Sequence, residues 1–412
     1  MLFRSVSSHD NTDLNLIESN KLEPKELTGP ILTLLQTIPI NGPYELFFWS
    51  KNKHLVTSVM DIITERIDNK NKLPLFFGIL DKTELMANEA LLKQEIDKII
   101  NGESIFCSIF QWENRISHAA QETINSLYNL TSPKSDEKDF AQTHTSKLQD
   151  IIALIANETL GAGNADTFPS DAVNQGLLPV LSDILQNIDL PINTWKSAAP
   201  KIGQRVDSDS VTKAKLNSFY HVEITNPDFP KNHRGVFLPI STDYISVPKN
   251  LTKMCSKLGV NNLDEIKRSE FINYEKLTKD NNEHLLNDIT LGFIELSAEC
   301  DHAQRKTKLH RYIISALIPE ELHSYCMFHN SKTTKHDGIY RAPEIYIDNK
   351  TFTLMLSFKY QIGTMDEFMV GGEKVGHKWF GNPKFRLRDQ ILTDISFKCS
   401  QYTSRPGIIS FH

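Results

Sequence analysis

Several features that mark whole classes of protein are missing from this chain. None of its apolar stretches reaches the ~18 residues that a membrane-spanning helix needs. Its first residues, MLFRSVSSHDNTDLNL, contain neither the apolar core nor the cleavage pattern of a secretory signal. An excess of basic residues is missing too, since 45 Lys and Arg face 51 Asp and Glu, a net charge of −6. The lack of long apolar stretches predicts no membrane association. Domains that bind nucleic acid are usually strongly basic, so we expect no nucleic acid as the main ligand.

The cysteines are too few and too scattered to form a disulfide framework. The five are Cys107, Cys255, Cys300, Cys326 and Cys399. Small disulfide-stapled secreted proteins carry an even and dense set instead, so we expect a reducing, cytoplasmic location. The 412 residues, of which 40% are hydrophobic and 23% charged, are typical of about two or three globular domains.

Apolar runs alternate with helical patterns in the first third of the chain. After an N-terminal extension at 1–40, strands are predicted at 44–49, 73–80 and 105–110, and helices at 55–67, 84–100 and 113–130. Continuous apolar strands between helices are typical of a parallel sheet that is covered on both faces. We therefore predict an α/β domain over 41–131 that is flavodoxin-like, or receiver-like.

The rest of the chain has a different pattern. After a polar linker, residues 148–200 are predicted to be a helical connector, and 214–412 an α+β domain with a mixed or barrel-like sheet. The strands expected there are 219–224, 235–240, 291–296, 312–318, 345–347 and 351–358. An amphipathic helix is expected at 385–399, and its start is basic, with Arg386 and Arg388. Such a helix usually packs on its own domain, whereas a phosphate contact would need arginines clustered in space.

The N-terminal domain lacks the acids that receiver chemistry requires. A phospho-accepting receiver holds magnesium with acidic residues after its first strand, but Trp49-Ser50-Lys51-Asn52 stands there. Asp81, which ends the second strand, is the phospho-acceptor candidate, and a helix-capping role is the favoured interpretation. A TIR-type NADase would need a glutamate in a helix of its cleft, and neither Glu113 nor Glu122 matches that position.

The densest polar cluster of the chain follows the strand at 291–296. The candidate catalytic residues within it are Cys300, Asp301, His302, Gln304 and Lys306. Cys300 would act as a nucleophile, with His302 or His310 as its base. In the alternative, structural interpretation, Cys300 is a packed thiol, and Asp301 and Gln304 bond the loop backbone.

Zinc is an alternative use of the same region. A tetrahedral site needs four N or S ligands, which two pairs could supply: Cys300-x-His302 and Cys326-x2-His329. One intervening residue is unusually tight spacing, and His323 and His336 compete as ligands. We therefore expect no cofactor and keep zinc as the alternative.

Several segments resemble a known bacterial family. GPYELFFWS at 42–50, Leu80-Asp81-Lys82, and WENR through HAAQET at 112–123 resemble a divergent response-receiver-like domain, a pseudo-receiver found in large proteins from antiphage-defence loci. ECDHAQ-x-K at 299–306, RLR at 386–388 and SRPG at 404–407 resemble recurring signatures of the same proteins. The resemblance implies a cytoplasmic component of a multigene defence system that works beside an ATPase or an effector. It implies no reaction, and the missing acids mean that phosphorelay is not carried over.

These observations predict a regulatory or adaptor subunit of a bacterial antiviral defence complex. It would act through protein–protein contacts with partners encoded in the same locus, and an oligomer is compatible with this role. The candidate partner-binding residues are Trp49, Trp112, Glu113 and Arg115. The alternative is a defence effector enzyme, a nucleotide or nucleic-acid hydrolase with its site around Cys300-Asp301-His302.

Overall fold

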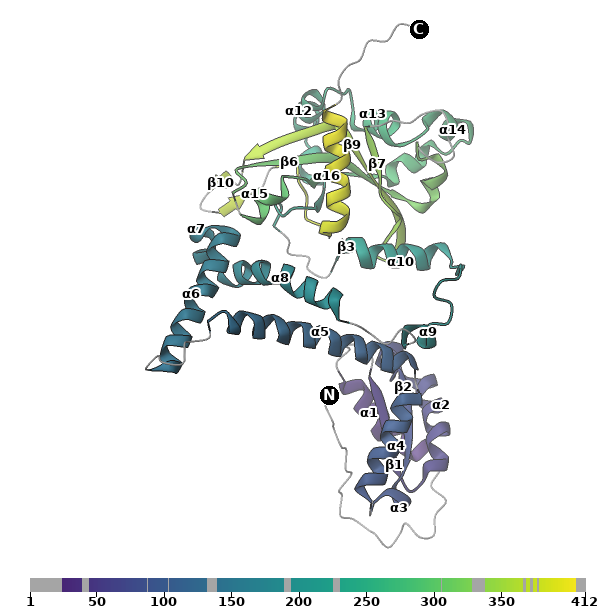
Figure 1. Ribbon diagram of the computed structural model, residues 1–412. Coiled ribbons are helices and arrows are strands. Elements are labelled where there is room, and N and C mark those ends of the chain that lie inside the picture. The colour runs from purple at the N-terminus through teal and green to yellow at the C-terminus, as the bar shows by residue number, and fades with distance from the viewer. Residues whose placement is uncertain are drawn as a thin grey trace. The chain divides into compact units, whose positions relative to one another are not determined.

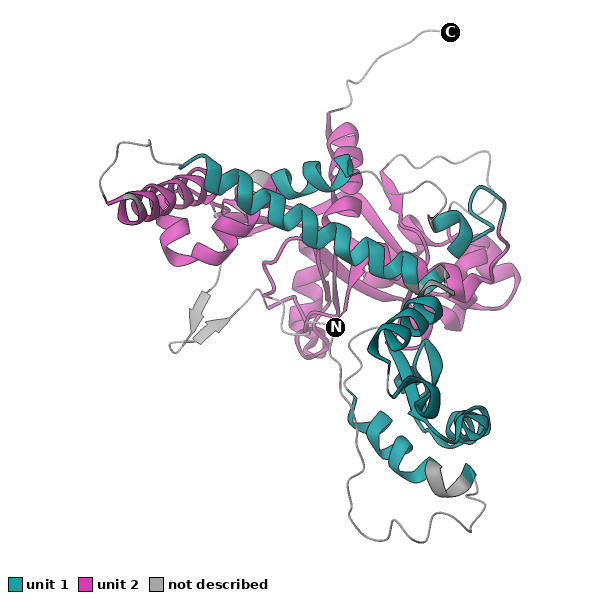
Figure 2. Ribbon diagram, turned by 60° about the horizontal axis from the view of Figure 1, so that its bottom comes forward, with its two compact units in different colours: residues 1–132, 179–205 teal, residues 133–178, 206–412 magenta. Residues whose placement is uncertain are grey.

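The protein forms two compact units (Figure 2). Unit 1 comprises 1–132 and 179–205, and unit 2 comprises 133–178 and 206–412. The computed structural model describes residues 24–38, 44–86, 88–102, 104–131, 139–188, 194–224, 230–304, 306–327, 338–365, 368–370, 373–375 and 378–404. Among them, no helix is both long and apolar enough to cross a lipid bilayer.

Unit 1 combines a pair of parallel strands with helices (Figure 1). Its elements are α1 (Pro24–Thr37), β1 (Glu45–Ser50), η1 (Lys53–Leu55), α2 (Val56–Arg66), η2 (Lys70–Lys72), β2 (Phe76–Asp81), α3 (Lys82–Leu85), α4 (Glu89–Gly102), α5 (Ser104–Asn129) and α9 (Thr194–Ala198). β1 and β2 pair from Glu45 with Phe76 to Ser50 with Asp81. Leu35 of α1 packs with Val59 and Ile63 of α2 in the core of this unit.

The third predicted strand, at 105–110, is wrong, because these residues belong to α5. Ile105 and Ile109 are four residues apart and so share one face of a helix. The helical pattern continues through 113–130, and one helix of 26 residues therefore accounts for both segments. Periodicity alone does not separate a short apolar run in a strand from one in a helix. The described part of unit 1 thus contains two of the predicted parallel strands.

Unit 2 begins with helices and continues into a curled antiparallel half-barrel sheet (Figure 1). The helices are α6 (Phe140–Leu160), α7 (Ala162–Thr167) and α8 (Pro169–Asn187), the last of which runs on into residues of unit 1. The strands of the sheet are β3 (Val222–Glu223), β12 (Phe385–Leu387), β4 (Val236–Pro239), β5 (Thr290–Glu295), β6 (Leu309–Pro319), β9 (Lys350–Met365) and β7 (Ile339–Arg341), in this spatial order, with β8 (Ile345–Ile347) also paired to β9.

The remaining elements of unit 2 flank this sheet. They are α10 (Ser210–His221), α11 (Thr242–Ile245), α12 (Pro248–Leu258), α13 (Leu263–Ile266), η3 (Lys267–Phe271), α14 (Tyr274–Lys279), η4 (Glu283–Asp288), α15 (Glu299–Ala303), η5 (Glu320–Tyr325), α16 (Asp389–Thr403) and the pair β10 (Phe368–Val370) and β11 (Glu373–Val375). The strand predicted at 219–224 is mostly wrong, because α10 extends to His221 and leaves two residues for β3. The side chain of Asp209 accepts a hydrogen bond from the Thr212 N–H and caps this helix.

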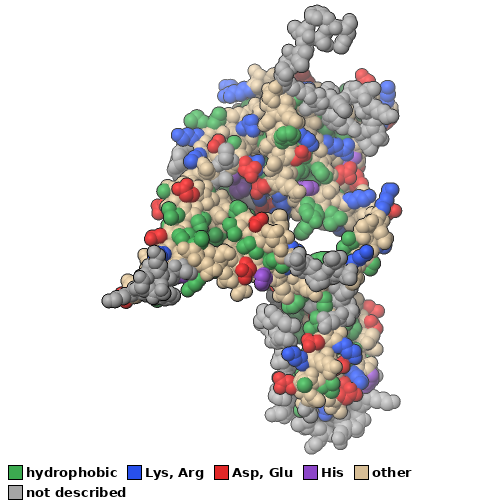
Figure 3. Space-filling view, viewed as in Figure 1, with side chains coloured by type: hydrophobic (Ala, Val, Ile, Leu, Met, Phe, Trp, Pro, Cys, Tyr) green, Lys and Arg blue, Asp and Glu red, His purple; other side chains and the backbone are tan. Residues whose placement is uncertain are grey.

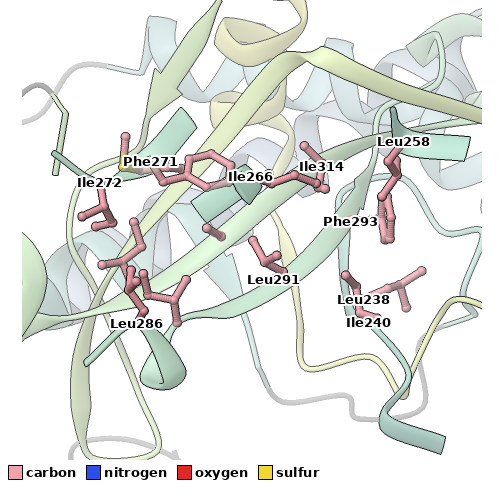
Figure 4. Packing of buried hydrophobic residues seen from close by; sticks show 14 of the residues in the cluster. Leu238, Ile240, Leu258, Ile266, Phe271, Ile272, Leu286, Leu291, Phe293 and Ile314 are labelled. Atoms are coloured by element: carbon pink, nitrogen blue, oxygen red, sulfur yellow. The ribbon is translucent and has the colours of Figure 1, made fainter. Parts of the chain in front are cut away.

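Both faces of the sheet are buried, and successive residues of its central strands point to opposite faces. Phe293 of β5 and Ile314 of β6 join one apolar cluster, which α12, α13 and α14 cover (Figure 4). Their neighbours Ile294 and Ile313 join the other cluster, which α16 covers with side chains that include Leu392. This double coverage explains why the sequence of β5 and β6 is an almost continuous apolar run rather than an alternating one.

Gly292 tests how tightly this core is packed. A Cβ atom there would lie 2.5 Å from the carbonyl oxygen of Leu238 and 2.8 Å from the ring of Phe237. We expect Gly292→Ala to lower the free energy of unfolding by about 1–3 kcal/mol, measured by urea denaturation. Gly163→Ala is the matched control, because a Cβ added there would have no atom within 4 Å other than those of its chain neighbours and of its own helix backbone; it should be neutral or stabilising by up to about 1 kcal/mol. A Gly292→Ala variant as stable as the wild type would contradict the tight packing around Gly292.

Candidate ligand pocket in unit 2

A pocket of about 740 Å³ opens in unit 2 where β5 ends and β6 begins. Its walls come from the α7–α8 region, the loop before β4, α15, the start of β6 and the junction of β12 with α16. The charged and titratable residues that line it are Asp171, His233, Arg234, Glu299, His302, His310, Arg386 and Asp389. The pocket is therefore built from segments that are far apart in the sequence.

The loop before β4 places His233 and Arg234 in the pocket lining, and its conformation depends on Gly235. Gly235 has a φ of +83°, and a Cβ there would lie 2.5 Å from Leu392 and 2.7 Å from the carbonyl oxygen of Leu387. Its N–H donates a hydrogen bond to the carbonyl oxygen of Glu295 at 2.9 Å. Because a side chain would be strained there and would clash, glycine lets the loop pass close to α16 and places Arg234 beside the end of β5.

A carboxylate–imidazole pair lies buried at the pocket. Glu295 is the last residue of β5, and its Oε1 lies 3.1 Å from Nδ1 of His310 on the neighbouring strand β6. The Ser297 N–H donates a hydrogen bond to the same oxygen at 3.2 Å. A neutral imidazole that donates its Nδ1–H to a carboxylate carries its lone pair on Nε2. The pair therefore has the arrangement of a histidine oriented as a general base.

Two further imidazoles meet edge to face in the same pocket. The ring centroids of His233 and His302 are 5.1 Å apart, with 65° between the ring planes. Burial lowers the pKa of His302 to about 4, and the neighbouring His233 adds to this lowering. Burial also lowers the pKa of His233. At neutral pH His302 is therefore uncharged, and its ring can donate one hydrogen bond and accept another.

The pocket contains charges of both signs. Arg234 is 3% exposed, and its Nε donates a hydrogen bond to the carbonyl oxygen of Ser297 at 3.3 Å. Arg386 lies on β12, before α16 begins, and its Nε donates to Glu223 Oε2 at 3.0 Å. The two arginines share the lining with the carboxylates of Asp171, Glu299 and Asp389. Figure 3 likewise shows acidic and basic side chains interspersed on the visible face.

The structure brings one of the five predicted catalytic residues to the pocket, namely His302. Asp301 and Lys306 are exposed. The side chain of Gln304 accepts a hydrogen bond from Nζ of Lys306 at 2.8 Å, and its backbone oxygen accepts one from the side chain of Asn164 in α7. The side chain of Cys300 lies outside the described residues. Around His302 the structure places a different set of neighbours from those that the sequence cluster predicts.

The structure does not bring the candidate zinc ligands together among the residues that it describes. His329 and His336 lie outside the described residues. Cys326 is buried beside the carbonyl oxygen of Leu322, and burial raises the pKa of its thiol to about 11. His323 lies 3.2 Å from the carboxylate of Glu344. Within the described part of the chain, no three His, Cys, Asp or Glu side chains are placed to hold a metal ion.

Asp81 has a local structural role in unit 1. Its Oδ1 accepts a hydrogen bond from the Thr83 N–H at 2.8 Å and so caps α3, and its Oδ2 lies 2.7 Å from Nζ of Lys53. The hydrogen bond from Lys53 is the main cause that lowers the pKa of Asp81. The carboxylate that would accept a phosphoryl group is therefore engaged in a helix cap and an ion pair.

The candidate partner-binding residues of unit 1 differ in exposure. Trp49 on β1 is 48% exposed and Trp112 on α5 is 49% exposed, and Glu113 is exposed as well. Nζ of Lys82 lies 5.9 Å from the ring centre of Trp49. Arg115, in contrast, donates a hydrogen bond to the carbonyl oxygen of Leu185 at 2.6 Å, and so links α5 to the end of α8.

Sequence reasoning missed Glu295, His233 and Arg234. Glu295 did leave a signal, because a carboxylate inside the apolar run LGFIEL is costly to bury unless it has a partner. His233-Arg234-Gly235 precedes a strand, and no other local sequence feature indicates that these residues line a pocket. With the geometry established, comparisons of this chain with protein-family models, with curated proteins and with solved structures give no match.

The pKa of His302 predicts part of the pH dependence of stability. Its pKa is about 4 in the folded protein, below the ordinary value of 6.5, so the unfolded chain binds more protons between these values. The contribution is complete above about pH 6.5 and is lost as the pH falls towards about 4. We expect His302→Gln to lose less stability than the wild type between about pH 7 and pH 5, by on the order of 1 kcal/mol after allowance for solvent screening.

Urea denaturation at the two pH values measures this difference. His284→Gln is the matched control, because His284 is exposed and lies outside the pocket lining. It should keep the pH dependence of the wild type. A His302→Gln variant that loses as much stability as the wild type would contradict a buried, uncharged His302.

Proposed function

We propose that the chain is a regulatory or adaptor protein of a bacterial antiviral defence complex, that it acts in the cytoplasm, and that unit 1 binds a protein partner. In this proposal unit 1 is a reduced receiver-like domain. The parallel pair β1–β2 with its intervening helix supports this interpretation, as do the segments at 42–50 and 112–123 that resemble receiver-like domains of defence proteins.

The observation that carries the proposal is the exposure of two tryptophans in a unit whose candidate phospho-acceptor is occupied. Trp49 and Trp112 each leave about half of their surface exposed, and tryptophan is among the residues that contribute most to protein interfaces. Asp81 is engaged by Thr83 and Lys53. A receiver-like surface with structural rather than phosphoryl chemistry is suited to contact with a protein.

We expect Trp112→Ala and Trp49→Ala to weaken binding of a locus-encoded partner by about tenfold or more each. The tagged chain would be purified from cells that express its whole locus, and the complex measured by native mass spectrometry and by titration. Phe397→Ala is the matched control, because Phe397 is an exposed aromatic residue, 62% accessible, on α16 of unit 2. A wild-type chain that binds no product of its own locus would refute the proposal.

A second candidate function, hydrolysis of a nucleotide, is favoured by the buried pair Glu295–His310. In this reaction a water molecule from the pocket reaches Nε2 of His310, which is buried in the structure, and gives it a proton, while the oxygen of the water attacks the phosphorus and the bond to the leaving oxygen breaks. Glu295 holds the imidazole and stabilises its protonated form. The predicted hydrolase site around Cys300 would then be replaced by one centred on His310 and His302.

If the pocket is hydrolytic, His310→Asn should lower the rate of nucleotide hydrolysis about a hundredfold to ten-thousandfold, because the general base is lost. Phosphate release by the purified chain measures this rate, and circular dichroism checks the fold. His284→Asn, which changes an exposed histidine outside the pocket lining, should keep the full rate. A His310→Asn variant that is as fast as the wild type would exclude this mechanism.

A further inference from the structure

Arg234 is a buried guanidinium whose charge is incompletely satisfied. Its Nε donates to the carbonyl oxygen of Ser297, and one of its terminal nitrogens, Nη2, donates to Oγ of Ser396 on α16 at 3.4 Å. The other terminal nitrogen, Nη1, is buried and has no hydrogen-bond partner among the residues that the structure describes. A buried donor without an acceptor is costly, and this side chain lines the pocket.

The two carboxylates nearest to Arg234 are loosely held. Oε2 of Glu299 lies 3.5 Å from Nη2, and Oδ1 of Asp389 lies 3.6 Å from Nη1. Close arginine–carboxylate pairs have N–O distances of about 2.7–2.9 Å. The side chain of Glu299 is 60% exposed and that of Asp389 is 69% exposed. Either carboxylate can therefore turn into solvent at little cost when another anion approaches the guanidinium.

Other donors lie around the same space. Thr307 lines the pocket, and its buried hydroxyl has no hydrogen-bond partner within the described part of the chain. The imidazole of His302 and the guanidinium of Arg386 also line the pocket. An oxyanion that lies against Arg234 would therefore find hydrogen-bond donors from α15, from the segment before β6 and from β12.

We propose that Arg234 binds the oxyanion of a small ligand, a phosphoryl or carboxylate group, and that the rest of the ligand fills the pocket. The volume of about 740 Å³ is far larger than an inorganic ion needs and is typical of small-molecule sites. Phe168 contributes an aromatic wall on the side of α8. The inference goes beyond the binding of a protein partner by unit 1 and holds whether or not the ligand is hydrolysed.

The charge balance of the pocket determines which change is most informative. Two arginines share the lining with the carboxylates of Asp171, Glu299 and Asp389, so the chain's own acids compete with a bound anion. Glu299 is the best residue to change, because its side chain is 60% exposed and its ion pair with Arg234 is long, at 3.5 Å. Asp389 also pairs with Arg386 at 3.6 Å, so its removal would have additional effects.

The test is titration calorimetry of the full chain with inorganic phosphate, adenosine 5′-monophosphate and succinate. We expect at least one probe to bind, and Glu299→Gln to tighten its binding about three- to tenfold by removing the competing charge. Glu275→Gln, which removes an exposed carboxylate outside the pocket lining, should leave the affinity unchanged. Arg234→Lys should weaken binding at least tenfold, because lysine lacks the planar fork of donors.

The probes distinguish the two sources of the oxyanion. Tighter binding of either phosphorylated probe than of succinate supports a phosphoryl ligand, and the reverse supports a carboxylate ligand. If Arg234→Lys does not fold, the affinity of Glu299→Gln for the probes still tests whether an anion binds at Arg234. The proposal is overturned if no probe binds the wild type or Glu299→Gln, or if Glu299→Gln leaves the affinity unchanged. Loss of the locus partner in the purification experiment affects none of these outcomes, so the two proposals fail separately.

Discussion

The central sheet of unit 2 must bury both of its faces, and the rest of this unit depends on that constraint. Phe293 and Ile314 pack under the helices α12–α14, while Ile294 and Ile313 pack under α16. Strands covered on both sides bury a charged group at high cost, and such groups are accommodated most easily at the strand ends. The candidate pocket lies at such an end, where β5 stops at Glu295 and β6 starts one residue before His310.

The polar groups at that end of the strands differ in how closely they are paired. Glu295 and His310 are buried and bonded to each other, so they form a rigid base for the pocket. Arg234 is equally buried but paired at long distance with carboxylates that reach into solvent. This combination is suited to holding a ligand. The Glu295–His310 pair keeps its geometry, while Arg234 can exchange its carboxylate partners for a ligand anion.

The sequence predicts elements well where a local pattern has one interpretation. The apolar runs at 291–296 and 312–318 are β5 and β6, as expected, whereas the similar run at 105–110 continues directly into a helical pattern and is part of α5. His302 was found because polar residues follow a strand. The position of Arg234 next to it depends on the pairing of β4 with β5 across more than fifty residues, and no local pattern encodes such a contact.

The long sequence separation of the pocket walls has a consequence for biosynthesis. Asn164 of α7 and Asp389 of α16 line the same pocket, so a growing chain carries the first wall long before the ribosome has made the last. The pocket of unit 2 is therefore incomplete until α16 has been synthesised and has packed on the sheet. A ligand that fills the pocket would act as a molecular staple between early and late segments, and its presence during synthesis would favour the completed fold over partly folded chains.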